Sequence, residues 1–154
     1  MNAKLGGTPW AVDNLPFMKE PTMICGMDVF HSTALGKKSV LALTASMNSS
    51  ATTYWSTSVI QDEIGQEGST NLQTGMQNAL EAFKRNNGAL PSNIVFYRDG
   101  VGEGQVQGIC LPEVEQIKAA GPWHPGNRAE IIGQTSSTIY VDEAQQQEII
   151  ESKK

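Results

Sequence analysis

The hydrophobic pattern of this chain changes its period part-way along, and this change limits the folds that the chain can adopt. Three apolar runs of strand length come first, at residues 22–30, 39–46 and 54–61, and short turns rich in Gly, Ser and Asn separate them. Such spacing predicts an antiparallel meander. Apolar residues then recur at the spacing of one helical face, namely Leu72, Met76, Ala79, Leu80 and Phe83. We therefore expect strands first and a helix after them.

A second helix and a fourth strand complete the predicted layout. The first helix should stop at residues 86–88 (Asn-Asn-Gly). Residues 93–98 should then form a strand that ends before Asp99 and Gly100. A helix that leads back to a strand normally makes a parallel pair. A further helix should run through Glu113 and Ile117. The order is βββαβα, an α/β fold with a mixed sheet.

Length and composition exclude several classes of protein. The chain has 154 residues, the size of one domain, and its 39% of hydrophobic residues can form a core. No apolar run reaches the roughly 18–20 residues that a membrane span needs, and the N-terminus lacks the layout of a secretory signal. Cys25 and Cys110 lie in apolar stretches, and we expect them to be buried thiols in a reducing compartment. We expect an intracellular protein of the cytoplasm or nucleus, with no membrane partner.

The charge of the chain argues against simple electrostatic capture of nucleic acid. There are 16 acidic and 11 basic residues, which gives a net charge of −5. The acid is concentrated in residues 62–118. A protein that holds phosphates by charge alone usually has a basic face. Another reason for the acidic residues is needed.

Two aspartates stand out because of their place in the predicted strands. Asp28 lies within an apolar run, and Asp99 follows the end of another. A lone buried carboxylate is expensive unless it is paired, protonated or bound to a metal. Two carboxylates at the ends of adjacent strands suit a divalent cation. Alternatively each aspartate stabilises a turn by binding nearby backbone N–H groups. Spacing alone leaves both interpretations open.

Several longer strings resemble a known family. They are NAKLGGTPW (residues 2–10), MICGMDVFH (23–31), SVLALTASMN (39–48), YRDGVGEGQ (97–105) and EVEQI (113–117). In this order they resemble the PIWI domain of Argonaute and Piwi proteins, and the Piwi branch more than the Argonaute branch. YRDGVGEGQ is long and specific. The resemblance covers about three quarters of the chain, so we expect a partial PIWI domain at residues 1–118 and a divergent tail at residues 119–154.

The resemblance implies an RNase H-like fold, here incomplete, and guide-directed cleavage of RNA in small-RNA silencing. The family's catalytic set is Asp, Glu, Asp and a fourth His or Asp, which hold two divalent ions, Mg²⁺ or Mn²⁺. Asp28 and Asp99 match the two aspartates and would be the metal ligands. Glu67 matches the loop glutamate, with Glu63 as its rival. Lys4 matches a lysine that contributes to the pocket for the 5′ phosphate of the guide.

The same resemblance leaves the activity of this chain open. No residue after 118 matches the fourth catalytic residue, because the surroundings of His124 differ from the family motif. The family's next strand is not recognisable either, although residues 136–141 (SSTIYV) could form a strand. We therefore expect an unpaired sheet edge unless residues 121–154 cover it. Three hypotheses remain. The chain is part of an RNA-cleaving protein that binds a small guide RNA and a target RNA, with PAZ, MID and further PIWI portions elsewhere in a longer parent. Otherwise it is a non-catalytic module that binds guide and target, or an inert truncated fragment.

Overall fold

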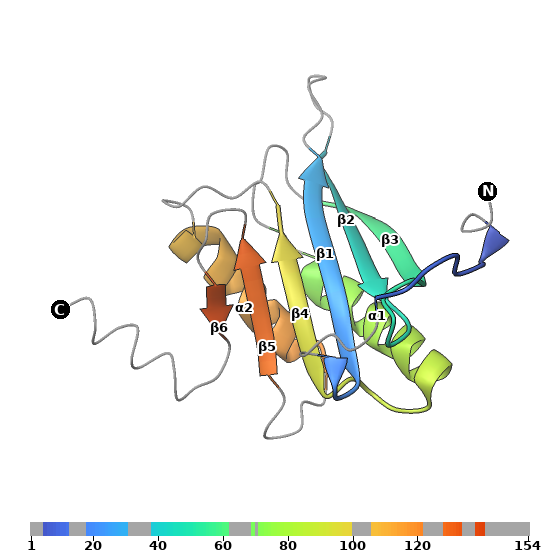
Figure 1. The fold of residues 1–154 in the computed structure, drawn as a ribbon. Helices are drawn as coiled ribbons and strands as arrows, with labels where there is room; N and C mark the ends of the chain where they lie inside the picture. The colour runs from blue at the N-terminus through green and yellow to red at the C-terminus, as the bar shows by residue number, and fades with distance from the viewer. Residues whose placement is uncertain are drawn as a thin grey trace.

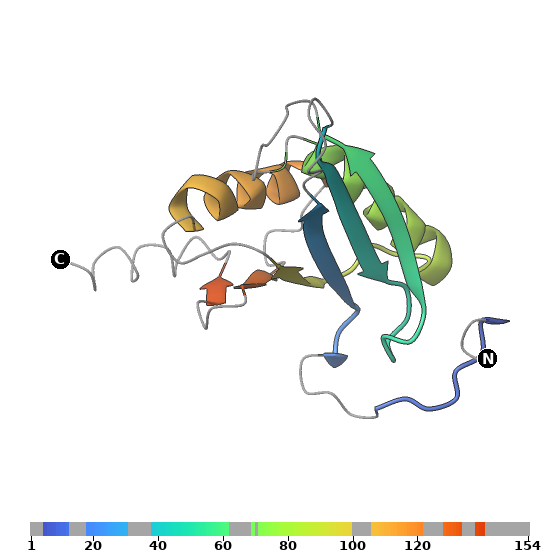
Figure 2. The same cartoon turned by 90° about the horizontal axis from the view of Figure 1, so that it is seen from above.

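The structure is a computed structural model, and it shows one mixed sheet with two helices on one of its faces (Figure 1). In Figure 2 both helices lie on the same side of the sheet, and the segment near the N-terminus lies on the other side. The residues that the structure describes are 5–12, 18–30, 38–61, 69, 71–99, 106–121, 128–133 and 138–140.

The sheet has the strand order β3-β2-β1-β4-β5-β6. β1 pairs with β2, β2 with β3 and β5 with β6 in antiparallel fashion, whereas β1 with β4 and β4 with β5 are parallel. In Figure 1 the arrows of β1, β4 and β5 therefore point the same way. The strands are β1 (Thr22–Phe30), β2 (Val40–Ser46), β3 (Tyr54–Ile60), β4 (Asn93–Arg98), β5 (Arg128–Gly133) and β6 (Thr138–Tyr140).

The helices are α1 (Leu72–Asn87) and α2 (Leu111–Ala119), and a π-helical turn, η4 (Val106–Cys110), leads into α2. The predicted apolar face of α1 is buried along its whole length. α1 ends at Gly88, whose left-handed backbone (φ 79°) lets its N–H donate to the Lys84 carbonyl at 2.8 Å. Pro112 fits the first turn of α2, where a backbone N–H has no partner within the helix.

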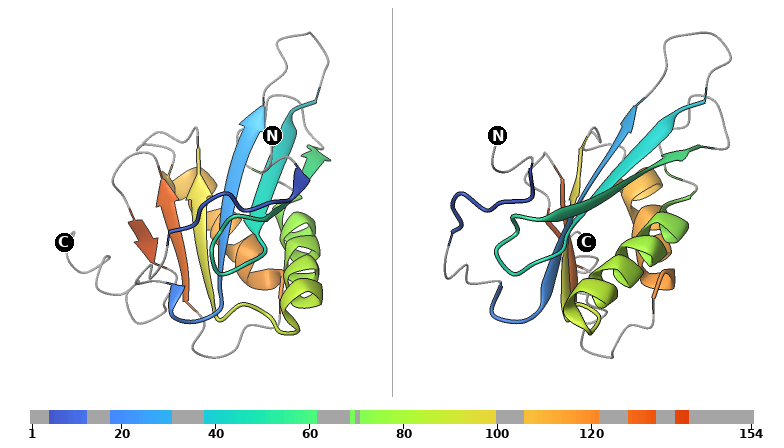
Figure 3. Two further views of the ribbon diagram at one scale, coloured as in Figure 1. Left: turned by 45° about the vertical axis from the view of Figure 1, so that its right-hand side comes forward. Right: turned by 90° about the vertical axis from the view of Figure 1, so that its right-hand side faces the viewer.

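The core lies between the helices and one face of the sheet, as the side views in Figure 3 show. Alternate residues of β1, β2 and β4 point into it because side chains alternate along a strand. The largest of these side chains are Met23, Leu41, Leu43, Ile94 and Phe96. The opposite face of these strands carries intermediate or exposed residues, apart from Thr22 and Ser46, which are buried.

The predicted meander, the crossover through α1, the fourth strand and the second helix are all present. β5 was not recognised in the sequence. It pairs with β4 in parallel, so residues of the tail cover the sheet edge beside β4. β6 lies within residues 136–141, which the sequence suggested as a strand. The domain boundary at residue 118 stays a prediction.

Candidate active site

Asp28 on β1 lies next to Asp99, the residue that directly follows the parallel strand β4. The pairing of β1 with β4 runs from Thr22 beside Asn93 to Met27 beside Arg98. It extends one step further, because the N–H of Asp99 donates to the carbonyl of Met27 at 3.1 Å. Asp28 therefore lies next to Asp99 across the strands. Adjacent strands are about 4.8 Å apart.

Both aspartates are on the face of the sheet that the helices leave open. Met27 and Arg98 are buried, and their successors Asp28 and Asp99 are exposed, as the alternation of side chains requires. This corrects the sequence interpretation, in which Asp28 belonged to a buried run. Gly26, two residues before Asp28 on the same face, is only half-buried. Exposed carboxylates keep their hydration, so the cost of burying an unpaired charge does not arise.

The immediate contacts of Asp28 leave room for a ligand. Its Oδ1 accepts the N–H of Val29 at 2.8 Å, which is the local turn-like bond that the alternative interpretation allowed. A carboxylate has two oxygens and about four acceptor sites, so this bond does not exhaust it. Two hard oxygen donors side by side fit a divalent cation such as Mg²⁺ or Mn²⁺. Within the described residues no group of three or more His, Cys, Asp or Glu is close enough to hold a metal.

A buried ion pair lies directly beneath this face. Arg98 and Glu113 are 4% and 2% exposed, and Nε of Arg98 donates to Oε2 of Glu113 at 3.0 Å. The side chain of Arg98 thus points away from the exposed side chain of Asp99, toward the helices. Burial raises the pKa of Glu113, while the hydrogen bond and charge of Arg98 and the N–H of Ser69 oppose that rise. Sequence reasoning placed Glu113 on a helix but did not identify this pairing.

The other predicted site residues lie outside the described residues. They are Lys4, Glu63, Glu67 and His124. The two ends of the segment that carries Glu63 and Glu67 are described. The N–H of Gln61 donates to the backbone carbonyl of Ser39 at 2.9 Å. Nδ2 of Asn71 donates to the Ile60 carbonyl at 3.3 Å. The described residues on the two sides of this segment, Ile60 and Asn71, are therefore held close together.

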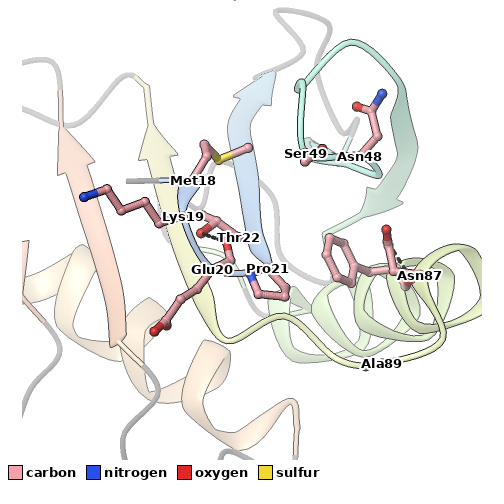
Figure 4. Close-up of a pocket in the computed structure, with 10 residues that line it drawn as sticks. Met18, Lys19, Glu20, Pro21, Thr22, Asn48, Ser49, Asn87 and Ala89 are labelled. Carbon is pink, nitrogen blue, oxygen red and sulfur yellow. Dashed lines mark hydrogen bonds between the residues drawn. The ribbon is translucent and has the colours of Figure 1, made fainter. Parts of the chain in front are cut away.

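A cavity of about 440 Å³ lies at the other end of β1 (Figure 4). Its lining includes Lys19, Pro21 and Thr22 at the start of β1, Asn48 in the turn after β2, and Asn87 at the end of α1. Asp28 is six residues along β1 from Thr22, about 20 Å at the rise of an extended strand. The cavity is therefore separate from the aspartate pair.

The described residues contain no helix long and apolar enough to cross a membrane.

Comparison with known proteins gives a consistent answer. A family model described as the Piwi domain matches residues 1–129. Piwi-like protein 1 of Danio rerio is 43% identical over 117 residues, which are 76% of this chain and 13% of the relative. Protein argonaute-3 of Drosophila melanogaster is 38% identical over 131 residues, 85% of this chain and 14% of the relative. The chain thus spans about one seventh of the length of these relatives.

Solved structures confirm the predicted RNase H-like fold class. The crystal structure of Drosophila Piwi covers 92% of this chain with a TM-score of 0.68 and 30% identity, and the chain covers 20% of that structure. Kluyveromyces polysporus Argonaute, crystallised with a guide RNA, covers 93% of this chain with a TM-score of 0.75 and 25% identity, and the chain covers 19% of it. The predicted resemblance to the Piwi branch is in keeping with the Piwi-like relatives.

Proposed function

This chain belongs to the Piwi domain family, and on that premise we propose that it is part of a longer protein that cuts RNA under the direction of a bound guide RNA. The parent would bind a small guide RNA and a target RNA and act in small-RNA silencing, in the cytoplasm or the nucleus. Its PAZ, MID and remaining PIWI portions would lie outside these residues. One of the solved neighbours holds a guide RNA, which supports nucleic acid as the partner.

The observation that carries this proposal is the position of Asp28 next to Asp99 on one open face. Asp28 lies in β1 and Asp99 directly follows β4, and each of these strands is paired on both sides in the sheet. Rigid placement of acidic ligands is what a cleavage site needs. The resemblance assigns the catalytic aspartates to the same two positions. Sequence motif and strand register therefore support the same pair independently.

In this proposal Asp28 and Asp99 hold Mg²⁺ or Mn²⁺ through their carboxylate oxygens. When two such ions are bound, they activate the attacking water and stabilise the leaving oxygen of a phosphodiester. The carboxylates also exclude the RNA phosphate from the strand ends until cations neutralise them, because like charges repel. This accounts for acidic residues in a protein whose partner is an anion.

Two further residues complete the proposal on the strength of the resemblance. Glu67, or Glu63 in its place, would join the site from the loop that follows β3. A loop glutamate can complete the site when substrate is aligned, since a loop moves more readily than a strand. Lys4 would contact the 5′ phosphate of the guide as one part of a pocket formed mainly by the MID portion of the parent.

The test is cleavage of a matched target by the guide-loaded parent protein in Mg²⁺. We expect Asp28→Ala and Asp99→Ala to abolish cleavage and to leave guide and target binding intact. Glu81→Ala is the matched control, because it removes an exposed carboxylate from α1, on the other side of the sheet. Cleavage that survives Asp99→Ala would overturn the proposal. Guide and target binding by a wild-type parent that never cuts would favour the non-catalytic module.

A further inference from the structure

Glu113 contacts two separate segments of the candidate site at once. Its Oε2 accepts Nε of Arg98 at 3.0 Å, and its Oε1 accepts Nη2 of the same guanidinium at 3.4 Å. The same Oε1 accepts the backbone N–H of Ser69 at 3.1 Å. One carboxylate on α2 thus binds the end of β4 and the segment before α1.

The first of these links reaches Asp99. Arg98 donates through Nη1 to the backbone carbonyl of Asp99, and the N–H of Asp99 donates to Met27 on β1. The peptide groups on both sides of the Asp99 side chain are therefore held. Glu113 orients the guanidinium of Arg98, because a planar guanidinium with two of its donors bound to one carboxylate has one favourable position. This orientation directs Nη1 of Arg98 at the Asp99 carbonyl.

The second link reaches the end of the loop that carries the candidate glutamates. Ser69 is 5% exposed and lies two residues after Glu67. Its N–H is bound by Glu113, and its carbonyl accepts Nε2 of Gln116 at 2.6 Å. Two side chains of α2 therefore bind both backbone polar groups of Ser69.

Stability alone does not account for a charged pair at this place. Removing two charges from water is costly, and well-packed apolar residues of similar volume are often equally or more stabilising. Apolar residues lack directed hydrogen bonds, however. The directed bonds of Glu113 are what join Asp99 to the loop end.

We propose that Glu113 is a positioning residue that holds the backbone of Asp99 and the end of the glutamate loop in fixed relation, and so sets the affinity of the site for its divalent ions. This inference rests on the proposed function. Glu113 itself is 2% exposed and is engaged by Arg98 and Ser69, so it acts through those residues.

The experiment compares Glu113→Gln with Glu115→Gln in the guide-loaded parent. Glu115 is the matched control because it lies on the same helix, is exposed, and pairs only at the surface with Lys118, at 3.1 Å. Three quantities are measured. They are the affinity for Mn²⁺ alone, from the concentration of unbound Mn²⁺ during a titration, the Mn²⁺ dependence of single-turnover cleavage, and the rates of amide hydrogen exchange.

For Glu113→Gln we expect Mn²⁺ affinity to fall about 10–100-fold, the range seen when a residue supporting a metal ligand is changed. Excess Mn²⁺ should restore part of the cleavage rate. Exchange should accelerate at the amides of Ser69 and Asp99 and stay unchanged in the centre of β1, for example at Cys25. Gln116→Ala, which removes only the bond to the Ser69 carbonyl, should show the same pattern more weakly.

The inference is overturned if Mn²⁺ affinity in Glu113→Gln stays within two-fold of the Glu115→Gln value. It is also overturned if two results occur together: amide exchange in Glu113→Gln accelerates equally throughout β1, and Gln116→Ala leaves the Mn²⁺ affinity unchanged. The first of these results would mean that the substitution causes a general loss of stability. Asp99→Ala separates the two claims. If that variant still cuts, the proposed function fails and the inference with it. If it does not cut and Glu113→Gln behaves as the control, only the inference fails.

Discussion

Replacing Glu113 by Leu should cost more stability than any surface change on α2. The side chains of Arg98 and Glu113 are 4% and 3% exposed, so the variant leaves a buried guanidinium without its counter-charge. The Ser69 N–H also loses its acceptor. Breaking one partner of a buried pair typically costs about 3–5 kcal/mol. For a domain of this size each kcal/mol lowers Tm by roughly 2–4 °C, so we expect Tm to fall by about 6–20 °C.

The double variant Arg98→Met/Glu113→Leu should lose less than Glu113→Leu alone. Burial raises the pKa of Glu113 even though Arg98 opposes the rise, so desolvation of the carboxylate outweighs its attraction to the guanidinium. Removing both charges therefore removes an unfavourable burial together with a favourable contact. The apolar pair also fills much of the same volume.

The assay is urea unfolding of the 154-residue chain as wild type, both single variants and the double variant, which together form a double-mutant cycle. Glu115→Leu is the control, and its exposed pair with Lys118 should contribute about 0–1 kcal/mol. The reasoning is refuted if Glu113→Leu lies within about 1 kcal/mol of the control, well below the range for a buried pair. A double variant less stable than Glu113→Leu would refute it as well.

Three further predictions follow from single residues. Gly88→Ala should destabilise the chain by about 1–2 kcal/mol because the φ of Gly88 is 79°. Gly108 has equally open space around it and no positive φ, so Gly108→Ala should be neutral or stabilising. Thermal melting of the two variants tests this difference. The pKa of Glu113 is raised in the folded chain, so the free energy of unfolding should fall as pH rises from 4.5 through that raised pKa. Glu113→Gln should show a smaller fall. Equal slopes of the free energy of unfolding against pH for the wild type and the variant would contradict this prediction. Burial raises the pKa of Cys25 to about 12, so iodoacetamide at pH 8 should modify Cys25 only on unfolding; rapid modification of the folded chain, read by mass spectrometry, would show otherwise.

The strands and the first helix could be predicted from the sequence because local periodicity decides them. Residues 22–30 and 93–98 form strands with the predicted limits, and the predicted face of α1 is the buried one. The position of Asp28 required the register of two strands. A strand as apolar as β1 does not show from its composition which face meets the helices.

Two features of the structure depend on contacts that local sequence does not contain. β5 includes Ala129 and Glu130, which are poor strand formers, and it forms a strand beside β4. The partner of Arg98 lies 15 residues further along the chain, on a helix, and only the packing of α2 against the sheet brings Glu113 to it. The assignment of Glu67 and Lys4 stays a prediction from the resemblance.

The most direct test of the account is the location of a bound ion in crystals of the protein soaked with Mn²⁺, read from anomalous scattering. We expect a peak on the open face of the sheet with carboxylate oxygens of both Asp28 and Asp99 about 2.0–2.3 Å away, near the distances typical of hard cations. The peak should vanish in Asp99→Ala. A peak bound by only one of the two aspartates, or one that persists in Asp99→Ala, would contradict the claim that these residues form one metal site.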